Sequence, residues 1–178
     1  MSFHNSVRRW RKDQRKQDLA AFKATFRLFQ QFSADTKNLD DIPRYWPQMK
    51  ARGLPAIQYT AREIRSGLRF VAYARRRSAG ASALFADRIQ TYLQRCGIDL
   101  EHLVWQTDNG GEFIGELQPD GSRSGFPKAV TFFGSQHARI PPAAHTYQSD
   151  VETVHRLIED EFYDLQTFRS RAEASGQA

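Results

Sequence analysis

The sequence predicts an α/β fold in which helices flank a mixed sheet, contained in one principal domain. Extended apolar segments and amphipathic helical segments follow one another in the order strand, strand, strand, helix, strand, helix, strand, helix. With 178 residues, 40% of them hydrophobic, the chain is long enough to bury a core. We find no internal repeat that would indicate a solenoid.

Five segments are predicted to be strands. The first three are rich in aromatic and β-branched residues, and the fourth is a short buried strand that ends in Asp-Asn-Gly-Gly. In chain order the segments are Leu28 to Ala34, Ala56 to Thr60, Leu68 to Ala74, His102 to Thr107 and Ala138 to Pro141.

Three segments are predicted to be helices. Ser78 to Arg95 has apolar residues at helical spacing and stops before Gly97, and a short helix is expected around Pro127 to Phe133. The last helix opens near Ser149. Its predicted apolar stripe is Val151, Val154, Ile158, Phe162 and Leu165, and its predicted polar side is Glu152, His155, Arg156 and Glu159.

Outside these elements, three segments carry turn formers or charge. Residues 1–27 include RRWRKDQRKQ and form a basic N-terminal arm or linker, and residues 167–178 are expected to be a disordered tail. Between them, residues 28–166 form the core. Gly115 to Gly125, GELQPDGSRSG, is predicted to be a mobile loop.

Composition favours an anionic partner. There are 26 Lys and Arg against 20 Asp and Glu, which gives a net charge of +6 and a pI near 9.7. An ordinary basic protein would show the same balance. The single cysteine, Cys96, cannot form an internal disulfide, and no run of 18 apolar residues occurs, so we expect a cytoplasmic protein without a membrane segment.

Three acidic residues stand where elements end or begin. Asp35 follows the first predicted strand, Asp108 follows the fourth, and Glu152 lies in the first turn of the last helix. Each also has a purely structural interpretation: a turn at Asp35, an Asx turn at Asp108, and a capping box between Glu152 and Ser149. Carboxylates brought together need a cation, and oxygen ligands suit Mg²⁺ and Mn²⁺, so the three predict a divalent metal site.

Three blocks of sequence then resemble a known family. The segments QQFSADTKNL, TDNGGEF and IPPAAHTYQSDVETVHRLIEDEFYD resemble the signature blocks of DDE transposases, the retroviral-integrase-like catalytic core of bacterial insertion-sequence elements. The resemblance extends from about Phe29 to Asp164.

This resemblance implies a ribonuclease-H-like fold and DNA chemistry. Asp35, Asp108 and Glu152 match the catalytic, metal-binding triad, with Mg²⁺ or Mn²⁺ as cofactor. The implied activity is metal-dependent phosphodiester hydrolysis followed by DNA strand transfer. The implied partners are transposon ends and target DNA, with a homo-oligomer on DNA, in the cytoplasm at the nucleoid.

Several assignments stay open at this point. Asp40 and Asp41 compete with Asp35 for the first acidic position, although Asp35 directly follows the apolar strand. Further candidates for DNA binding are Asn109, His155 and Arg156, although ordinary polar side chains in contact with solvent would account for them about as well. The histidines His137, His145 and His155 lack the spacing of a zinc site.

The chain begins close to the core, with no room for a pair of helix-turn-helix domains before it, so the sequence predicts a truncated or partial transposase. We therefore expect salt-sensitive DNA binding of low sequence specificity. The alternatives are a ribonuclease-H-like nuclease and a catalytically silent DNA-binding remnant.

Overall fold

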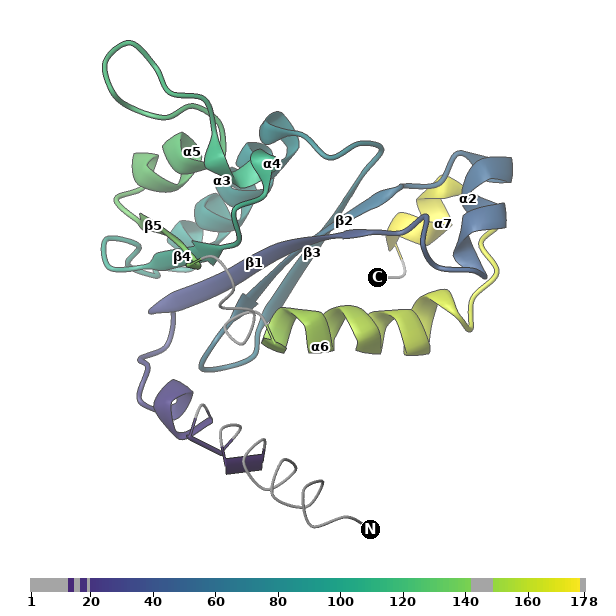
Figure 1. Ribbon diagram of the computed structural model, residues 1–178, viewed down its shortest axis with the longest axis horizontal. Coiled ribbons are helices and arrows are strands. Elements are labelled where there is room, and N and C mark those ends of the chain that lie inside the picture. The colour runs from purple at the N-terminus through teal and green to yellow at the C-terminus, as the bar shows by residue number, and fades with distance from the viewer. Residues whose placement is uncertain (1–12, 15–16, 19, 142–148, 177–178) are drawn as a thin grey trace.

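A mixed five-stranded sheet forms the centre of the molecule. The computed structural model describes residues 13–14, 17–18, 20–141 and 149–176. In these, the sheet has the order β3-β2-β1-β4-β5, with β1 antiparallel to β2 and parallel to β4 (Figure 1). The strands are β1 (Gln31–Asn38), β2 (Ile57–Glu63), β3 (Arg69–Ala74), β4 (Val104–Thr107) and β5 (Gln136–Arg139). The predicted mixed sheet and the predicted order of its strands are thereby confirmed, but the helix Tyr45–Arg52 between the first two strands was not predicted.

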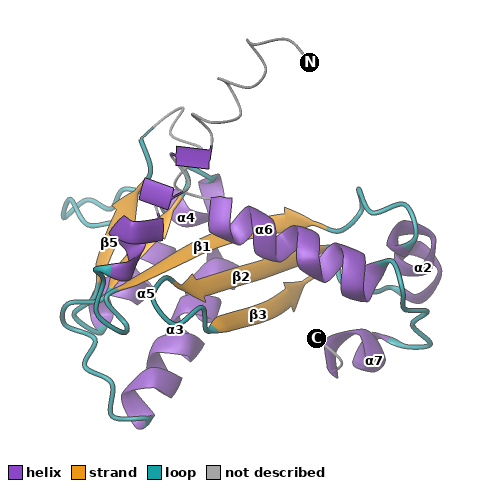
Figure 2. Ribbon diagram, turned by 90° about the horizontal axis from the view of Figure 1, so that it is seen from below, coloured by secondary structure: helices purple, strands orange, loops and turns teal. Residues whose placement is uncertain are grey.

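Helices cover both faces of this sheet. On one face lie α3 (Ala79–Arg95), α4 (Gly111–Ile114) and α5 (Phe126–Phe132). On the other, α6 (Ser149–Ile158) crosses β1 and β2 and continues into a π-helical turn, η2 (Glu159–Tyr163) (Figure 2). Two short helices, α2 (Tyr45–Arg52) and α7 (Arg171–Gly176), lie together near the far end of β1 and β2.

The main core fills the space between the sheet and α3 to α5. Successive side chains of a strand point to opposite faces, so Phe32 and Ala34 of β1 enter this core while Ser33 and Asp35 face α6. Phe32 stacks on Trp105 with ring centroids 5.1 Å apart, which joins β1 to β4. The polar residues of β1 are thus gathered on the α6 side of the sheet.

The segment that follows β1 and the C-terminal segment pack together into a second, smaller core. Its buried members are Leu39, Ile42, Tyr45, Leu54, Tyr163, Phe168 and Ala174. The segment after residue 166, which the sequence predicts to be disordered, therefore includes two buried side chains and α7. The sequence signal was weak because Phe168 is the single large apolar residue of this segment.

The first strand begins and ends later than its apolar pattern suggests. Phe29 has a φ of 58°, a left-handed conformation that interrupts extended backbone, and Leu28 is 62% exposed. In contrast, the polar run Asp35 to Asn38 pairs fully with β2. Asp35 is therefore an interior residue of β1, which corrects the prediction that it ends the strand.

Two segments that the sequence leaves outside the regular elements make specific contacts. Gly115 to Gly125 forms a small antiparallel bridge between Leu117 and Arg123, closed by a hydrogen bond from Gln118 N to Ser122 O of 2.8 Å. The basic N-terminal segment lies largely outside the described residues, and its end is tied to the β2–β3 turn by a 2.8 Å hydrogen bond from Arg65 Nη1 to Ala24 O. Among the described helices, none is long and apolar enough to cross a membrane.

Candidate functional site

Asp35 lies on the α6 face of β1, directly across from Thr60 of β2. Its Oδ1 accepts a 2.7 Å hydrogen bond from the backbone N–H of Thr36. The competing residues Asp40 and Asp41 lie beyond the strand, both exposed to solvent. Asp35 is therefore the acid of this segment that the sheet holds against α6.

Asp108 follows the last residue of β4, the parallel neighbour of β1. Its Oδ1 accepts a 2.8 Å hydrogen bond from Gly110 N, which is the Asx turn that the sequence allowed. Asn109 Nδ2 donates to Ile140 O at 3.0 Å and so ties this turn to the end of β5. The turn fixes one oxygen of Asp108 and leaves the other for a ligand.

Glu152 lies on α6 with its side chain exposed. The neighbouring Val151 and Val154 are buried against the sheet, which sets the rotation of the helix. Arg156, one turn further on, is also exposed, in agreement with the predicted polar side. This arrangement leaves both side chains open to a ligand, and Glu152 remains close enough to act electrostatically on Asp35.

The surroundings of Asp35 disfavour its ionisation. Burial, and to a smaller extent the negative charges of Asp108, Glu152 and Glu112, raise the pKa of Asp35 to about 7, against the lowering effect of the Thr36 N–H. Near neutral pH, Asp35 is therefore close to half protonated. A cation at this position would remove the penalty.

The sequence places His155 on the exposed polar side of the last helix. This prediction is wrong, because His155 is buried. It is 7% exposed, and burial together with the charge of Lys37 lowers its pKa to about 4. Its Nδ1 lies 3.9 Å from Asp35 Oδ2, and its Nε2 lies 3.0 Å from Thr60 Oγ1. His155 is thus a neutral side chain between α6 and the buried acid.

The contacts of Thr60 indicate which nitrogen of His155 carries the proton. Thr60 Oγ1 accepts a 2.9 Å hydrogen bond from Gln58 Nε2, and Gln58 Oε1 accepts one of 2.7 Å from the hydroxyl of Tyr163. The hydroxyl of Thr60 is then available to donate to His155 Nε2. This assignment leaves the N–H on Nδ1, directed toward Asp35.

A fourth carboxylate, Glu112, belongs to the same region. It lies in α4, has a side chain only 3% exposed, and accepts a 2.6 Å hydrogen bond from Thr36 Oγ1. A Cβ added to Gly110 would lie 2.8 Å from Glu112 Oε2 and 2.9 Å from Asp108 Oδ1. The close approach of two carboxylates explains the glycine. Glu112 stands within the TDNGGEF block, but nothing in the sequence distinguished it from a helix-surface acid.

An open groove runs beside these acids, between the end of β1, the β3–α3 connection and α6. It encloses about 630 Å³. Its lining residues are Thr36, Lys37, Asn38, Asp41, Arg77, Glu152, His155, Arg156, Glu159 and Asp160. The groove therefore gives solvent access to Glu152 and brings three basic side chains to the same surface.

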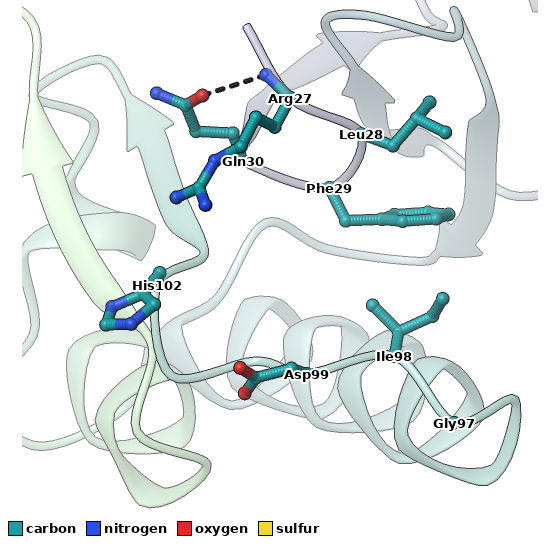
Figure 3. A pocket seen from close by; sticks show the side chains of 8 residues that line it. All are labelled: Arg27, Leu28, Phe29, Gln30, Gly97, Ile98, Asp99 and His102. Carbon is teal, nitrogen blue, oxygen red and sulfur yellow. Dashed lines mark hydrogen bonds between the residues drawn. The ribbon is translucent and has the colours of Figure 1, made fainter.

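A second hollow, of about 300 Å³, lies at the other end of β1 (Figure 3). It is formed by residues 27–30 before β1 and by the loop of residues 97–102 after α3. Figure 3 shows the apolar side chains of Leu28, Phe29 and Ile98 on one side of it. None of its lining residues is one of the acids described above.

Of the other two candidate histidines, His137 and His145, the structure describes only His137. His137 Nε2 lies 2.9 Å from Thr107 Oγ1, and burial lowers its pKa to about 4. His145 lies outside the described residues. Among the described residues, no three Asp, Glu, His or Cys side chains are grouped closely enough to hold a metal ion.

Comparisons with known proteins identify the fold. No protein-family model matches the chain, and no curated protein matches it. Among solved structures, it is similar to the catalytic core domain of BIV integrase, with a TM-score of 0.51 and 20% sequence identity. The match covers 82% of this chain and 77% of that one. The predicted ribonuclease-H-like fold is confirmed.

Proposed function

We propose that this chain is the catalytic core of a DNA transposase or integrase of the insertion-sequence type. It would hydrolyse a phosphodiester to free a 3′-hydroxyl and then join that end to a second DNA strand. One observation carries the proposal. Asp35 lies on β1, Asp108 directly follows the parallel neighbour β4, and Glu152 lies on the facing helix, near enough for the two others to raise the pKa of Asp35. The similarity to an integrase core supports it.

The donor atoms suit a hard divalent cation. All three side chains offer carboxylate oxygens, the ligands that Mg²⁺ and Mn²⁺ prefer, and their mutual repulsion is what a cation would relieve. In the structure, the three carboxylates lie farther apart than the ligands of a bound metal ion. Since Glu152 is exposed on a helix, its rotamer is the easiest of the three to change.

In this proposal Asp35, Asp108 and Glu152 hold Mg²⁺ or Mn²⁺. When bound, the ions supply activation of the attacking oxygen and neutralisation of the charge that develops on the phosphate. His155, whose Nδ1 lies 3.9 Å from Asp35 Oδ2, would steady Asp35 by packing and by electrostatic attraction rather than by a hydrogen bond. Asn109 holds the turn that presents Asp108, and Arg156 on the exposed side of α6 binds a phosphate.

The partner that we propose is DNA, both the element end and the target. The net charge of +6 favours a polyanion, and contacts to phosphates give affinity without reading sequence. Joining two ends to a target requires two active sites, so a homo-oligomer on DNA is part of the proposal.

The test is cleavage and strand transfer on labelled DNA that carries candidate ends, with Mg²⁺, with Mn²⁺ and with chelator. Products should require metal and should disappear in Asp35→Asn, Asp108→Asn and Glu152→Gln. Asp41→Asn is the matched control, because it removes an exposed acid that competes for the first position in the sequence.

The products also separate the alternatives. Cleavage without joining, under conditions where both can be detected, would indicate a nuclease of the same fold. DNA binding without products from a folded chain would indicate a silent remnant. Loss of activity in Asp41→Asn together with full activity in Asp35→Asn would overturn the proposed triad.

A further inference from the structure

The connection between β3 and α3 carries three consecutive arginines, Arg75, Arg76 and Arg77. Arg77 lines the groove beside Glu152. Its Nη2 donates a 3.0 Å hydrogen bond to Asn38 Oδ1, and its Nε lies 3.4 Å from Glu112 Oε1. Two elements thus hold one edge of its guanidinium, although 42% of the side chain is exposed.

Glu112 is a rigid partner for Arg77. Its carboxylate is almost completely buried and also accepts the hydroxyl of Thr36 at 2.6 Å. A buried carboxylate needs a counter-charge, which Arg77 supplies from the solvent side. In return, the geometry of Glu112 determines where the guanidinium points.

This arrangement leaves part of Arg77 for a ligand. A guanidinium has five N–H donors in a planar fork. The contacts to Asn38 and Glu112 use Nε and Nη2, and the side chain, 42% exposed, lines the groove with further N–H donors that these two contacts do not use. A fork held in this way loses little entropy when it binds a phosphate oxygen.

The charges of the groove show why such a residue is needed. Four acids line it: Asp41, Glu152, Glu159 and Asp160. Of the basic residues, Lys37 is already paired with Glu159 at 2.7 Å. A phosphate entering this groove therefore depends on Arg77 from the connector and Arg156 from α6.

We infer that Arg77 binds a backbone phosphate of the nucleic acid strand that occupies this groove, and that Glu112 is the residue that positions it. The inference rests on the proposed function, because it takes DNA as the ligand. It assigns to Glu112 a role outside the acidic triad, and it sets Arg77 apart from its two arginine neighbours.

The experiment measures the affinity of the full chain for a labelled DNA duplex in chelator by fluorescence anisotropy, over a range of salt concentrations. Arg77→Gln is compared with Arg76→Gln, which makes the same change of charge one residue away. We expect Arg77→Gln to bind roughly five- to tenfold more weakly and to lower the salt slope by about 0.9, as for one lost phosphate contact. Arg76→Gln should change affinity less than twofold.

Two further variants test the positioning. Arg77→Lys keeps the charge but loses the fork, so it should recover only part of the lost affinity. Glu112→Gln makes the chain more positive by one charge, which by charge alone would strengthen DNA binding. Because the proposal makes Glu112 hold Arg77, we expect weaker binding instead. Thermal unfolding of each variant checks that it is folded.

The outcomes are distinct. If the wild type binds DNA and Arg77→Gln binds it equally well, this inference alone is overturned. The same holds if Arg76→Gln weakens binding as much as Arg77→Gln does. Tighter binding by a folded Glu112→Gln chain would overturn the role of Glu112. No DNA binding by the wild type, even at low salt, would overturn the proposed function and this inference with it.

Discussion

The Nδ1 atom of His155 lies 3.9 Å from Oδ2 of Asp35, at the end of a buried series of polar contacts that starts at the hydroxyl of Tyr163. The series passes through Gln58 and Thr60 of β2 and links the second core to the acidic site. Each member is held by a neighbour on another element. The surroundings of Asp35 therefore extend to Thr60, Gln58 and Tyr163, which do not line the groove.

Replacing His155 with alanine should disturb Asp35 without removing an acid. We expect metal-dependent DNA cleavage to fall roughly 10- to 100-fold, the range typical of residues that orient metal ligands. Calorimetry with Mn²⁺ should show weaker binding to the variant, which separates this effect from a loss of DNA contact. His102→Ala, an exposed histidine, is the control. Activity within twofold of the wild type in His155→Ala would contradict this role.

Asp35→Asn should stabilise the metal-free chain at alkaline pH. The folded-state pKa of Asp35 is raised to about 7, so ionisation costs stability as the pH rises from about 4 through 7. With one pKa unit worth about 1.4 kcal/mol, the rise from 3.8 to about 7 corresponds to roughly 4 kcal/mol, so the variant should gain up to about that much in free energy of unfolding at pH 8. At pH 4 the two proteins should be nearly equal.

Urea unfolding in chelator at both pH values measures this difference. His155 has a lowered pKa, which makes stability fall as the pH drops from about 6.5 to 4, but it is present in both proteins and cancels to first order. A gain in Asp35→Asn of the same size at pH 4 and pH 8 would show that ionisation of Asp35 is not its cause. Added Mg²⁺ should stabilise the wild type more than the variant.

Gly110→Ala should separate two carboxylates at little cost to the fold. The backbone at Gly110 has φ −59° and ψ 139°, which alanine adopts readily, so the restriction is space alone. The added Cβ would lie within 3.0 Å of oxygens of both Asp108 and Glu112. We expect about 1 kcal/mol of destabilisation but at least a tenfold loss of cleavage activity, since small displacements of catalytic groups are costly.

Gly111→Ala is the matched control for this change, because no atom lies within 4 Å of the Cβ that it would add. Its cleavage activity should remain within about twofold of the wild type. Equal losses in the two variants would mean that the flexibility of the Gly-Gly pair matters, rather than the space between the carboxylates.

The apolar periodicity of the sequence correctly predicted the helices and strands whose burial follows a regular period. The amphipathic helix α3 and the strand before Asp108 lie close to their expected ranges, because burial follows a regular period there. The extent of β1 was not predictable in this way. Its polar second half is held by pairing with β2, a contact between residues about twenty positions apart.

The residues of the candidate site also fall into two groups: those that a sequence motif indicates, and those that only tertiary packing brings together. Motif resemblance proposed Asp35, Asp108 and Glu152, but the neutral, buried state of His155 depends on packing between α6 and the sheet. Glu112 and Arg77 are 35 residues apart in the sequence and meet only because α4 lies against the start of α3. No periodicity in either segment marks that pair.

Phe168→Ala should destabilise the whole domain, although Phe168 follows the last segment that the sequence assigned to the core. Its side chain is completely buried, and its ring packs edge-on against Tyr45 at 5.7 Å and at a tilt against Phe162 at 5.1 Å between ring centroids. Removal of a buried phenylalanine ring costs roughly 3–5 kcal/mol, because contacts are lost and a cavity remains. Leu165→Ala, at a side chain 65% exposed, should cost less than about 0.5 kcal/mol. Urea unfolding of both variants tests this prediction. Equal, small changes in the free energy of unfolding would mean that the C-terminal segment does not contribute to the folded core. A large loss in Phe168→Ala alone would make the second core part of the cooperative unit that holds α6 against Asp35.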